Sequence, residues 1–140
     1  MSSRSAPVVP DASVILKWVL DAEDEPGHAA ASHLLERWQQ GQLSLAVPPL
    51  WLYEVGNVLC LKRPADAAEA LAVLCDLGLD EVPLSGELVQ RTVALALSHG
   101  LTFYDAAYLA VAEERKAVLV TADNKFYRRL PAELAVELLA

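Results

Sequence analysis

The run "AVLVTAD", residues 117–123, constrains the fold of this chain more than any other segment. Its apolar part, which includes Val118 and Val120, shows no alternation of polar and apolar side chains. Such a short apolar run is typical of a strand that is buried on both faces in a parallel sheet. The run "PVVP", which ends just before Asp11, has the same form. We therefore expect at least two buried parallel strands, each followed closely by an acid.

Helical patterns lie between the expected strands. Strands are predicted in residues 7–10, 43–48, 80–84, 117–123 and 135–139. Helices are predicted in residues 12–20, 25–41, 50–63, 65–78, 85–100, 101–115 and 124–130. Ser13 and Ser85 are candidate helix caps, and Gly100 is a helix stop. Alternating strands and helices predict an α/β layer fold with a mostly parallel sheet, in one domain covering residues 1–140.

The amino-acid composition limits the kinds of function that this chain can have. Hydrophobic residues make up 54% of the 140 residues, which predicts a folded chain. No apolar run reaches the roughly 18 residues of a membrane span, and the N-terminus has no secretory signal pattern, so we expect a cytoplasmic protein with no membrane partner. Cys60 and Cys75 lack metal-ligand spacing and are expected to be free, buried thiols. The net charge of −8 argues against a nucleic-acid partner, unless several acids jointly hold cations.

Four acids stand out from the rest. Asp11 and Asp123 each follow an apolar run, and ligands of parallel α/β sheets bind at the carboxyl ends of the strands. Glu54 and Asp105 lie in apolar helical segments with no Lys or Arg within four residues. Singly, each acid has an ordinary explanation: a turn residue for Asp11 or Asp123, an exposed position for Glu54, and a cap or first-turn acid for Asp105. As a set of four they indicate a common site.

Carboxylates that converge on one point repel each other unless a cation neutralises them. Oxygen-only ligands favour hard cations such as Mg²⁺ or Mn²⁺. A cation held in this way can activate water and stabilise the leaving oxygen of a phosphodiester. The residues therefore predict metal-dependent phosphodiester chemistry.

Four segments resemble, in order and spacing, the motifs of the PIN-domain ribonucleases, most closely the VapC toxins of toxin–antitoxin pairs. The segments are "VVPDASVILKWVL", "WLYEVGNVL", "LTFYDAAYLAVA" and "LVTADNKF". The resemblance implies a three-layer α/β/α domain with a central sheet of four to five strands. It also implies an endoribonuclease that depends on Mg²⁺ or Mn²⁺, a homodimer, and a cognate antitoxin as partner.

The resemblance also implies roles for individual residues. Asp11, Glu54, Asp105 and Asp123 occupy the acidic metal-binding and catalytic positions. Ser13 and Thr121 match polar helpers that fix a carboxylate or a water, and Asn57 lies three residues after Glu54 on the same helix. Basic residues that follow the acids are candidates for RNA contacts: Lys17, Lys125, Arg128 and Arg129.

Other α/β proteins with acids at strand ends fit less well. A receiver domain needs an acidic pair where this chain has Pro10 and Asp11, and a haloacid dehalogenase-like phosphatase needs an acid where it has Ser13. An orphan PIN nuclease, or a catalytically silent PIN fold that acts as a binding scaffold, remains an open alternative.

Overall fold

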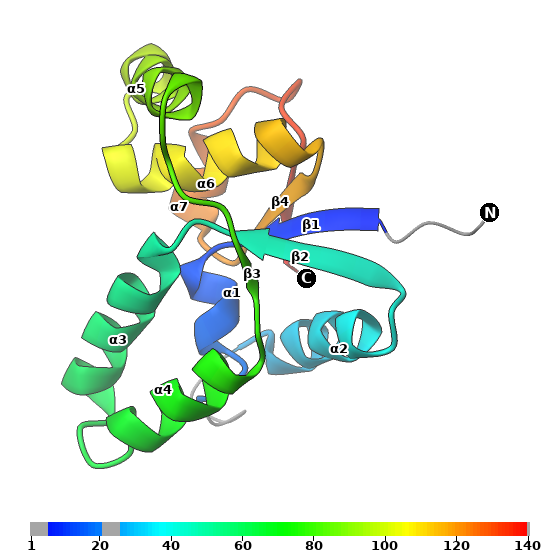
Figure 1. Ribbon diagram of the computed structural model, residues 1–140, viewed down its shortest axis with the longest axis vertical. Helices are drawn as coiled ribbons and strands as arrows, with labels where there is room; N and C mark the ends of the chain where they lie inside the picture. Colours follow the sequence, from blue (N-terminus) through cyan, green and yellow to red (C-terminus); the bar gives the residue numbers. More distant parts are fainter. Residues whose placement is uncertain (1–5, 21–25, 140) are drawn as a thin grey trace.

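The computed structural model describes residues 6–20 and 26–139, and within them five strands form one parallel sheet (Figure 1). The strands are β1 (Ala6–Pro10), β2 (Leu43–Val47), β3 (Asp80–Glu81), β4 (Val118–Thr121) and β5 (Val136–Leu138). Their order across the sheet is β3-β2-β1-β4-β5, and all four pairings are parallel. The predicted α/β class, parallel sheet and strand number are confirmed.

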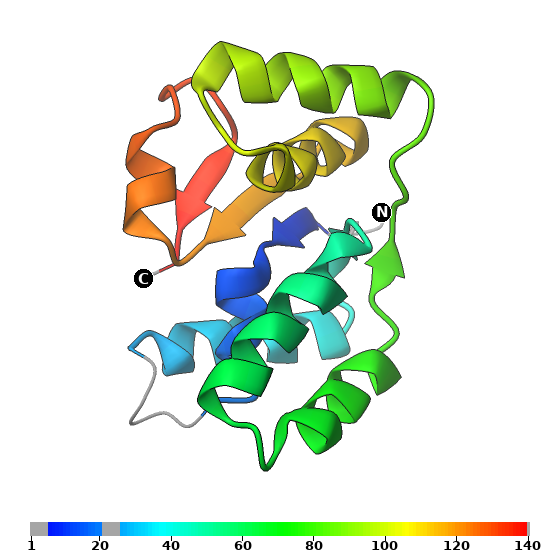
Figure 2. The same cartoon turned by 90° about the vertical axis from the view of Figure 1, so that its left-hand side faces the viewer.

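Helices connect the strands and cover both faces of the sheet. They are α1 (Ala12–Leu16), α2 (His28–Gln39), α3 (Leu50–Lys62), α4 (Ala67–Asp76), α5 (Glu87–His99), α6 (Phe103–Arg115) and α7 (Asn124–Arg128). Helices α1 to α4 lie on one side of the sheet, and α5 and α6 lie on the other (Figures 1 and 2). This is the expected three-layer α/β/α arrangement. Within residues 6–20 and 26–139, no helix is both long and apolar enough to cross a membrane.

The core forms where α6 packs against the sheet. Every residue from Ala106 to Ala112 is buried, because α5 covers the outer side of α6 and strands β1, β2 and β4 lie beneath it. Alanines on α6 allow close approach to the central strands, where Val9 and Leu119 are fully buried. Gly100 ends α5 in the left-handed conformation with φ of 64°, which glycine adopts without strain, as the sequence predicts.

The strand order reverses between β1 and β4. From β1 the chain adds β2 and β3 on one side, whereas β4 and β5 lie on the other side. Pro10 of β1 is level with Val120 of β4, and the backbone N–H of Asp11 donates to the carbonyl of Val120 at 3.1 Å. In parallel α/β sheets such a switch point opens a crevice at the carboxyl edge. The fold therefore places any ligand site next to Asp11 and the end of β4.

Several local predictions are wrong. Helix α1 ends at Leu16, short of the predicted residue 20, because the next three backbone bonds, beginning with Lys17 N–H to Val14 carbonyl, span three residues instead of four. The cap of α1 is Asp11, not Ser13, and the residue at the start of α5 is Gly86, with no side-chain cap from Ser85. The two capping errors concern which polar side chain accepts from the free N–H groups at a helix start. That choice depends on local backbone geometry.

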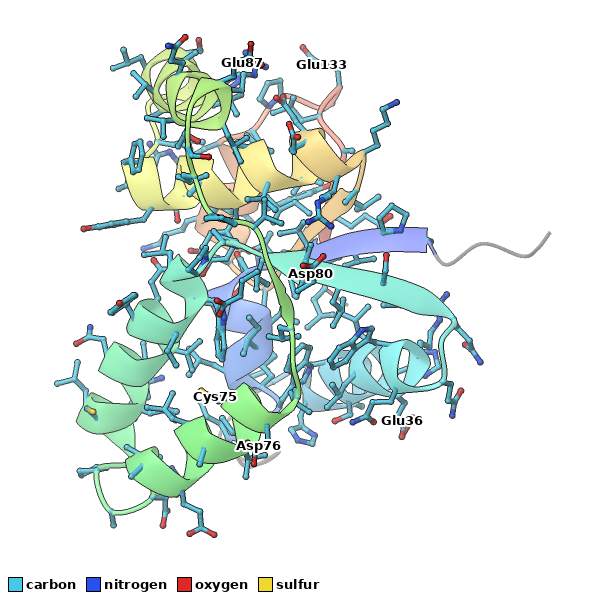
Figure 3. All side chains as sticks on the ribbon, viewed as in Figure 1. Glu36, Cys75, Asp76, Asp80, Glu87 and Glu133 are labelled. Carbon is cyan, nitrogen blue, oxygen red and sulfur yellow. The ribbon has the colours of Figure 1, made fainter. Side chains whose placement is uncertain are left out.

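Cys60 and Cys75 are free, as expected, but both are exposed, so the expectation of buried thiols is wrong. Cys60 lies on α3 and Cys75 lies on α4, where Figure 3 labels it.

Candidate active site

Asp11 lies at the carboxyl end of β1 and is 8% exposed. Its carboxylate caps α1, accepting hydrogen bonds from the backbone N–H groups of Ser13 at 3.0 Å and Val14 at 3.3 Å. Burial raises the pKa of Asp11, and the hydrogen bonds from Ser13, Thr121 and Val14 oppose that rise. The protein thus holds a carboxylate in a fixed orientation at a place where its charge is poorly solvated.

Ser13 links the ends of β1 and β4. Its hydroxyl donates to the Asp11 carboxylate and accepts from the backbone N–H of Ala122 at 2.9 Å. It also lies 3.5 Å from the hydroxyl of Thr121, which itself accepts from the backbone N–H of Asp123 at 3.0 Å. Two hydroxyls therefore help to set the relative placement of Asp11 and Asp123.

Asp123 follows β4 and caps α7. Its carboxylate accepts from the backbone N–H groups of Lys125 at 3.0 Å and Phe126 at 3.2 Å. The side chain is exposed, unlike that of Asp11. The turn-residue explanation is thus correct locally, and it does not conflict with a place in the site.

Glu54 projects from the second turn of α3 and is half-buried. The hydroxyl of Tyr108, on α6, donates to Glu54 Oε1 at 2.7 Å. Burial raises the pKa of Glu54, the bond from Tyr108 opposes this, and the negative charges of Asp105 and Asp11 raise it further. Burial and these same three acids raise the pKa of the Tyr108 hydroxyl, so it keeps its proton as a donor at neutral pH.

Asp105 is a first-turn acid of α6, and the cap of that helix is Thr102. The hydroxyl of Thr102 accepts from the backbone N–H of Asp105 at 3.0 Å. Burial and the charge of Asp123 raise the pKa of Asp105, while hydrogen bonding with Thr102 and the positive charge of Arg129 lower it. The first-turn alternative for Asp105 is therefore correct, and the cap alternative is not.

One hollow of about 250 Å³ brings the four acids together. It is lined by Asp11, Ala12, Ser13, Leu16, Glu54, Val58, Asp105, Tyr108 and Asp123. No lining residue is Lys, Arg or His, and the positive charge of Arg129 acts on Asp105 from outside the lining. The raised pKa values of Asp11, Glu54 and Asp105 reflect burial and, for Glu54 and Asp105, the proximity of other carboxylates.

The carboxylates surround the hollow without converging. Among residues 6–20 and 26–139, no three Asp, Glu, His or Cys side chains are close enough together to hold a metal ion as they stand. The donor set nevertheless fits a hard divalent cation, since it consists of carboxylate oxygens in a pocket with no basic side chain. A cation of this type would draw the side chains inward and relieve their repulsion.

Two sequence-based candidates lie elsewhere. Asn57 is exposed and does not line the hollow, whereas Val58 does. At 100° per residue, the position four after Glu54 lies closer to its face than the position three after it. Lys17 is 7% exposed, and its ammonium donates to the carbonyl of Pro26 at 2.6 Å, so it is neither a solvated surface residue nor a residue of the hollow.

Two residues that contact site acids were not predicted from the sequence: Tyr108, which lines the hollow, and Thr102, which caps α6 at the backbone N–H of Asp105. Tyr108 follows Asp105 by three positions, a spacing that puts both side chains on one helix face. Thr102 precedes Asp105 by three positions, the T-x-x-D pattern of a helix start. Both signals are present in the sequence, but a buried tyrosine is far more often a core residue.

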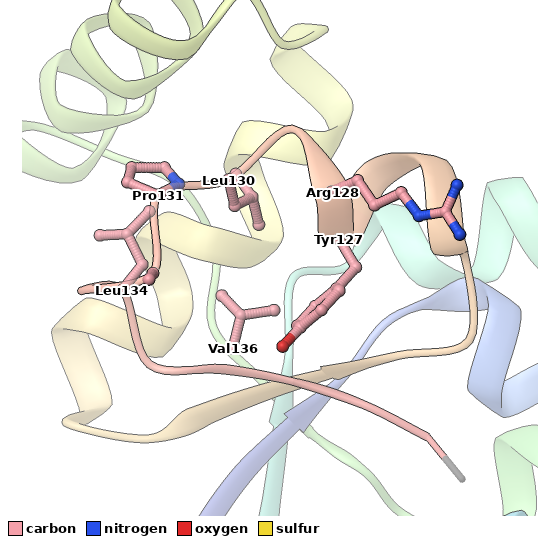
Figure 4. Close-up of a pocket in the computed structure, with 7 residues that line it drawn as sticks. Tyr127, Arg128, Leu130, Pro131, Leu134 and Val136 are labelled. Carbon is pink, nitrogen blue, oxygen red and sulfur yellow. The ribbon is translucent and has the colours of Figure 1, made fainter.

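A second hollow of about 250 Å³ lies between α7 and β5 (Figure 4). It is lined by Tyr127, Arg128, Leu130, Pro131, Ala132, Leu134 and Val136. With no carboxylate and only one charged side chain, it lacks the groups for phosphodiester chemistry. The remaining acids labelled in Figure 3, such as Glu36, Asp76 and Glu133, lie on separate elements at the surface. The acid-lined hollow at the sheet edge is the candidate site.

Comparison with known proteins identifies the family of the chain. The chain matches the PIN domain family over residues 8–129. It is 32% identical over 119 residues to the exonuclease VapC9 of Pyrobaculum aerophilum, covering 80% of this chain and 86% of the relative. It is 33% identical over 133 residues to the ribonuclease VapC3 of the same organism, covering 89% of this chain and 95% of the relative.

The fold is also similar to a toxin–antitoxin complex from Klebsiella pneumoniae, with a TM-score of 0.65 and 21% identity over 93% of this chain and 95% of that chain. This likeness concerns the fold alone. The family match and the two relatives, which together span most of the sequence, show that the chain belongs to the PIN-domain family and is VapC-like within it.

Proposed function

We propose that this protein is a metal-dependent endoribonuclease and the toxin of a type II toxin–antitoxin pair. The observation that carries the proposal is the hollow at the carboxyl edge of the sheet, which four carboxylates surround and which has no basic side chain among its lining residues. The relatives named as an exonuclease and a ribonuclease support nuclease chemistry. Mg²⁺ and Mn²⁺ are the ions that such oxygen ligands favour.

Asp11, Glu54 and Asp105 are proposed as the main cation ligands, and Asp123 as a further contributor. When bound, the cation supplies the positive charge that acidifies water and stabilises the charge that develops on the phosphate. Ser13 holds the Asp11 carboxylate through its hydroxyl, while Thr121 fixes the backbone that carries Asp123. These contacts keep the acids oriented, so that less reorganisation is required when substrate arrives.

RNA contacts are proposed on α7. Lys125, Arg128 and Arg129 are exposed on and just after this helix, which begins directly after Asp123. The chain as a whole has a charge of −8, so favourable contacts with phosphates must be local. Arg129 is close enough to the site for its positive charge to lower the pKa of Asp105, and Lys125 follows Asp123 by two residues. Arg128 lines the second hollow, and Lys17 is excluded from the surface by burial.

Two partners are proposed, an antitoxin and a second copy of this chain. An antitoxin partner is supported by the similarity in fold to a toxin–antitoxin complex. A homodimer is supported by exposed apolar side chains at the end of α5 and the start of α6, where Leu97 is 80% and Phe103 is 42% exposed. A cytoplasmic location is part of the proposal. Light scattering of wild type and Leu97→Glu tests the dimer, which the charged residue should dissociate.

Cleavage of a circular RNA tests the function. A circularised RNA pool with a randomised segment offers no ends, so only an endonuclease can open it. We expect the full chain to linearise circles with Mn²⁺ or Mg²⁺ but not with EDTA, and Asp11→Asn and Asp105→Asn to fail. Cleavage of linear RNA alone would make the protein an exonuclease, as the name of one relative suggests.

A catalytically silent scaffold is the alternative. It predicts no cleavage of either RNA and no change in thermal unfolding when Mn²⁺ is added. Full activity in both Asn variants would contradict the assignment of the site, even if the protein proved to be a nuclease.

A further inference from the structure

Tyr108 occupies an unusual position for a buried tyrosine. Its side chain is 2% exposed, yet it forms part of the wall of the acidic hollow. Its hydroxyl donates to Glu54 Oε1 at 2.7 Å, across 54 positions of sequence. The polar end of an otherwise core residue is thus directed at one of the four site acids.

The Tyr108–Glu54 bond joins the two helical layers. Tyr108 comes from α6, which packs on the sheet face covered by α5, and Glu54 comes from α3, which packs against α1 on the opposite side (Figure 2). The two helices meet beyond the carboxyl edge of the sheet, at the hollow. The bond therefore fixes Glu54 relative to α6, the helix that also carries Asp105.

We propose that Tyr108 is a positioning residue that holds the Glu54 carboxylate for cation binding, with Oε1 engaged by the phenol and Oε2 as the ligand. This inference rests on the proposed function, because it assigns a partner to one of its metal ligands. The residue touches neither cation nor substrate in this role. It acts through Glu54.

Side-chain freedom makes such an anchor effective. Glu54 is half-buried and has a long flexible arm, and its α3 neighbours Val55 and Val58 offer it no hydrogen bond. The Tyr108 ring is packed among the core residues of α6 and has little freedom. A rigid donor that orients a flexible carboxylate reduces the conformational entropy lost when a cation binds. Removal of such partners typically weakens metal binding about 10- to 100-fold.

Mn²⁺ affinity, measured by calorimetry on the full chain, tests the inference without any substrate. We expect Tyr108→Phe to bind Mn²⁺ about 10- to 100-fold more weakly than wild type. Tyr53→Phe is the matched control, because it removes the same hydroxyl from a 76% exposed tyrosine adjacent to Glu54. This control should bind Mn²⁺ as wild type does.

A double-mutant cycle separates positioning from general stability. If Tyr108 acts through Glu54, adding Tyr108→Phe to Glu54→Gln should weaken Mn²⁺ binding no further. An equal loss in both backgrounds would mean that the phenylalanine merely loosens the fold, and would overturn the inference. Unchanged Mn²⁺ affinity in Tyr108→Phe would also overturn it, while leaving the proposed function intact.

Two further results complete the test. If wild type itself binds no Mn²⁺, the proposed function fails, and this inference fails too because it rests on that function. If Tyr108→Phe does not fold, Tyr108→Met replaces it, since methionine fills the space in the core without a hydroxyl donor. Weakened Mn²⁺ binding in Tyr108→Met supports the role of Tyr108, and full affinity overturns it.

Discussion

The hydroxyl of Ser13 accepts a hydrogen bond from the backbone N–H of Ala122 at 2.9 Å and thereby ties the start of α1 to the end of β4. The same hydroxyl donates to the Asp11 carboxylate. Ser13 thus connects the ends of β1 and β4, the two strands between which the strand order reverses. Its loss should affect both the stability of the fold and the placement of Asp11.

Ser13→Ala should lower the free energy of unfolding by about 1–3 kcal/mol, because it leaves the N–H of Ala122 without its partner. Chemical denaturation measures this loss. Ser98→Ala removes a hydroxyl from an exposed position of α5 and should change stability little. Similar stabilities for the Ser13 and Ser98 variants would show that the bridge is energetically unimportant.

Thr102→Ala should destabilise the protein by about 0.5–2 kcal/mol, because the threonine hydroxyl caps α6 at the N–H of Asp105. Ser85→Ala is the control, since the start of α5 has no side-chain cap. Equilibrium unfolding of the two variants should differ clearly. A comparable loss in Ser85→Ala would mean that Ser85 caps α5 in solution.

Stability of the metal-free protein should depend on pH through the buried acids. The pKa of Asp11 is raised in the folded protein, so the folded chain binds this proton more tightly than the unfolded chain does. The resulting stabilisation is complete below the unfolded pKa of about 4 and is lost as pH rises through the folded pKa. The charge of Asp11 therefore costs stability at neutral pH.

Asp11→Asn removes this titration and keeps an oxygen that can cap α1. In EDTA, its melting temperature relative to wild type should rise as pH increases from about 4 to 8. Asp76→Asn, at the exposed end of α4, controls for the loss of one negative charge. A difference between Asp11→Asn and wild type that stays constant over this range would refute the explanation by burial.

Mn²⁺ should stabilise the wild-type fold. A ligand present at a hundred times its dissociation constant adds about 2.7 kcal/mol to the free energy of unfolding. Asp105→Asn should reduce the rise in melting temperature, because it removes one carboxylate of the hollow. An equal rise in both proteins would place Mn²⁺ at some other position, and EDTA should reverse the effect in wild type.

Much of the fold follows from local patterns. The apolar runs before Asp11 and Asp123 form β1 and β4, as predicted. Helical periodicity predicted α3, α5 and α6 with bounds close to those observed. The acids at the strand ends meet at one edge because parallel strands present their carboxyl ends together. Adjacent strands also explain why Ser13 and Thr121 lie near each other.

Details that depend on packing could not be predicted in the same way. Lys17 looks like a surface residue in the sequence, but it is buried with its ammonium on the carbonyl of Pro26. Asn57 and Val58 are adjacent in the sequence, yet only Val58 lines the hollow, because the exact rotation of α3 decides which neighbour of Glu54 faces inward. Periodicity defines an apolar face without fixing this rotation.

The sequence by itself therefore determined the α/β class, the parallel sheet and the two acids at its carboxyl edge, Asp11 and Asp123, since these depend on hydrophobic periodicity and strand direction. Only the tertiary structure decided that the Tyr108 hydroxyl donates to Glu54. It also decided that Asp11, Glu54, Asp105 and Asp123 surround a hollow without converging. The physical reason is that contacts between distant helices depend on how they pack on opposite faces of the sheet. No local pattern of residues encodes that packing.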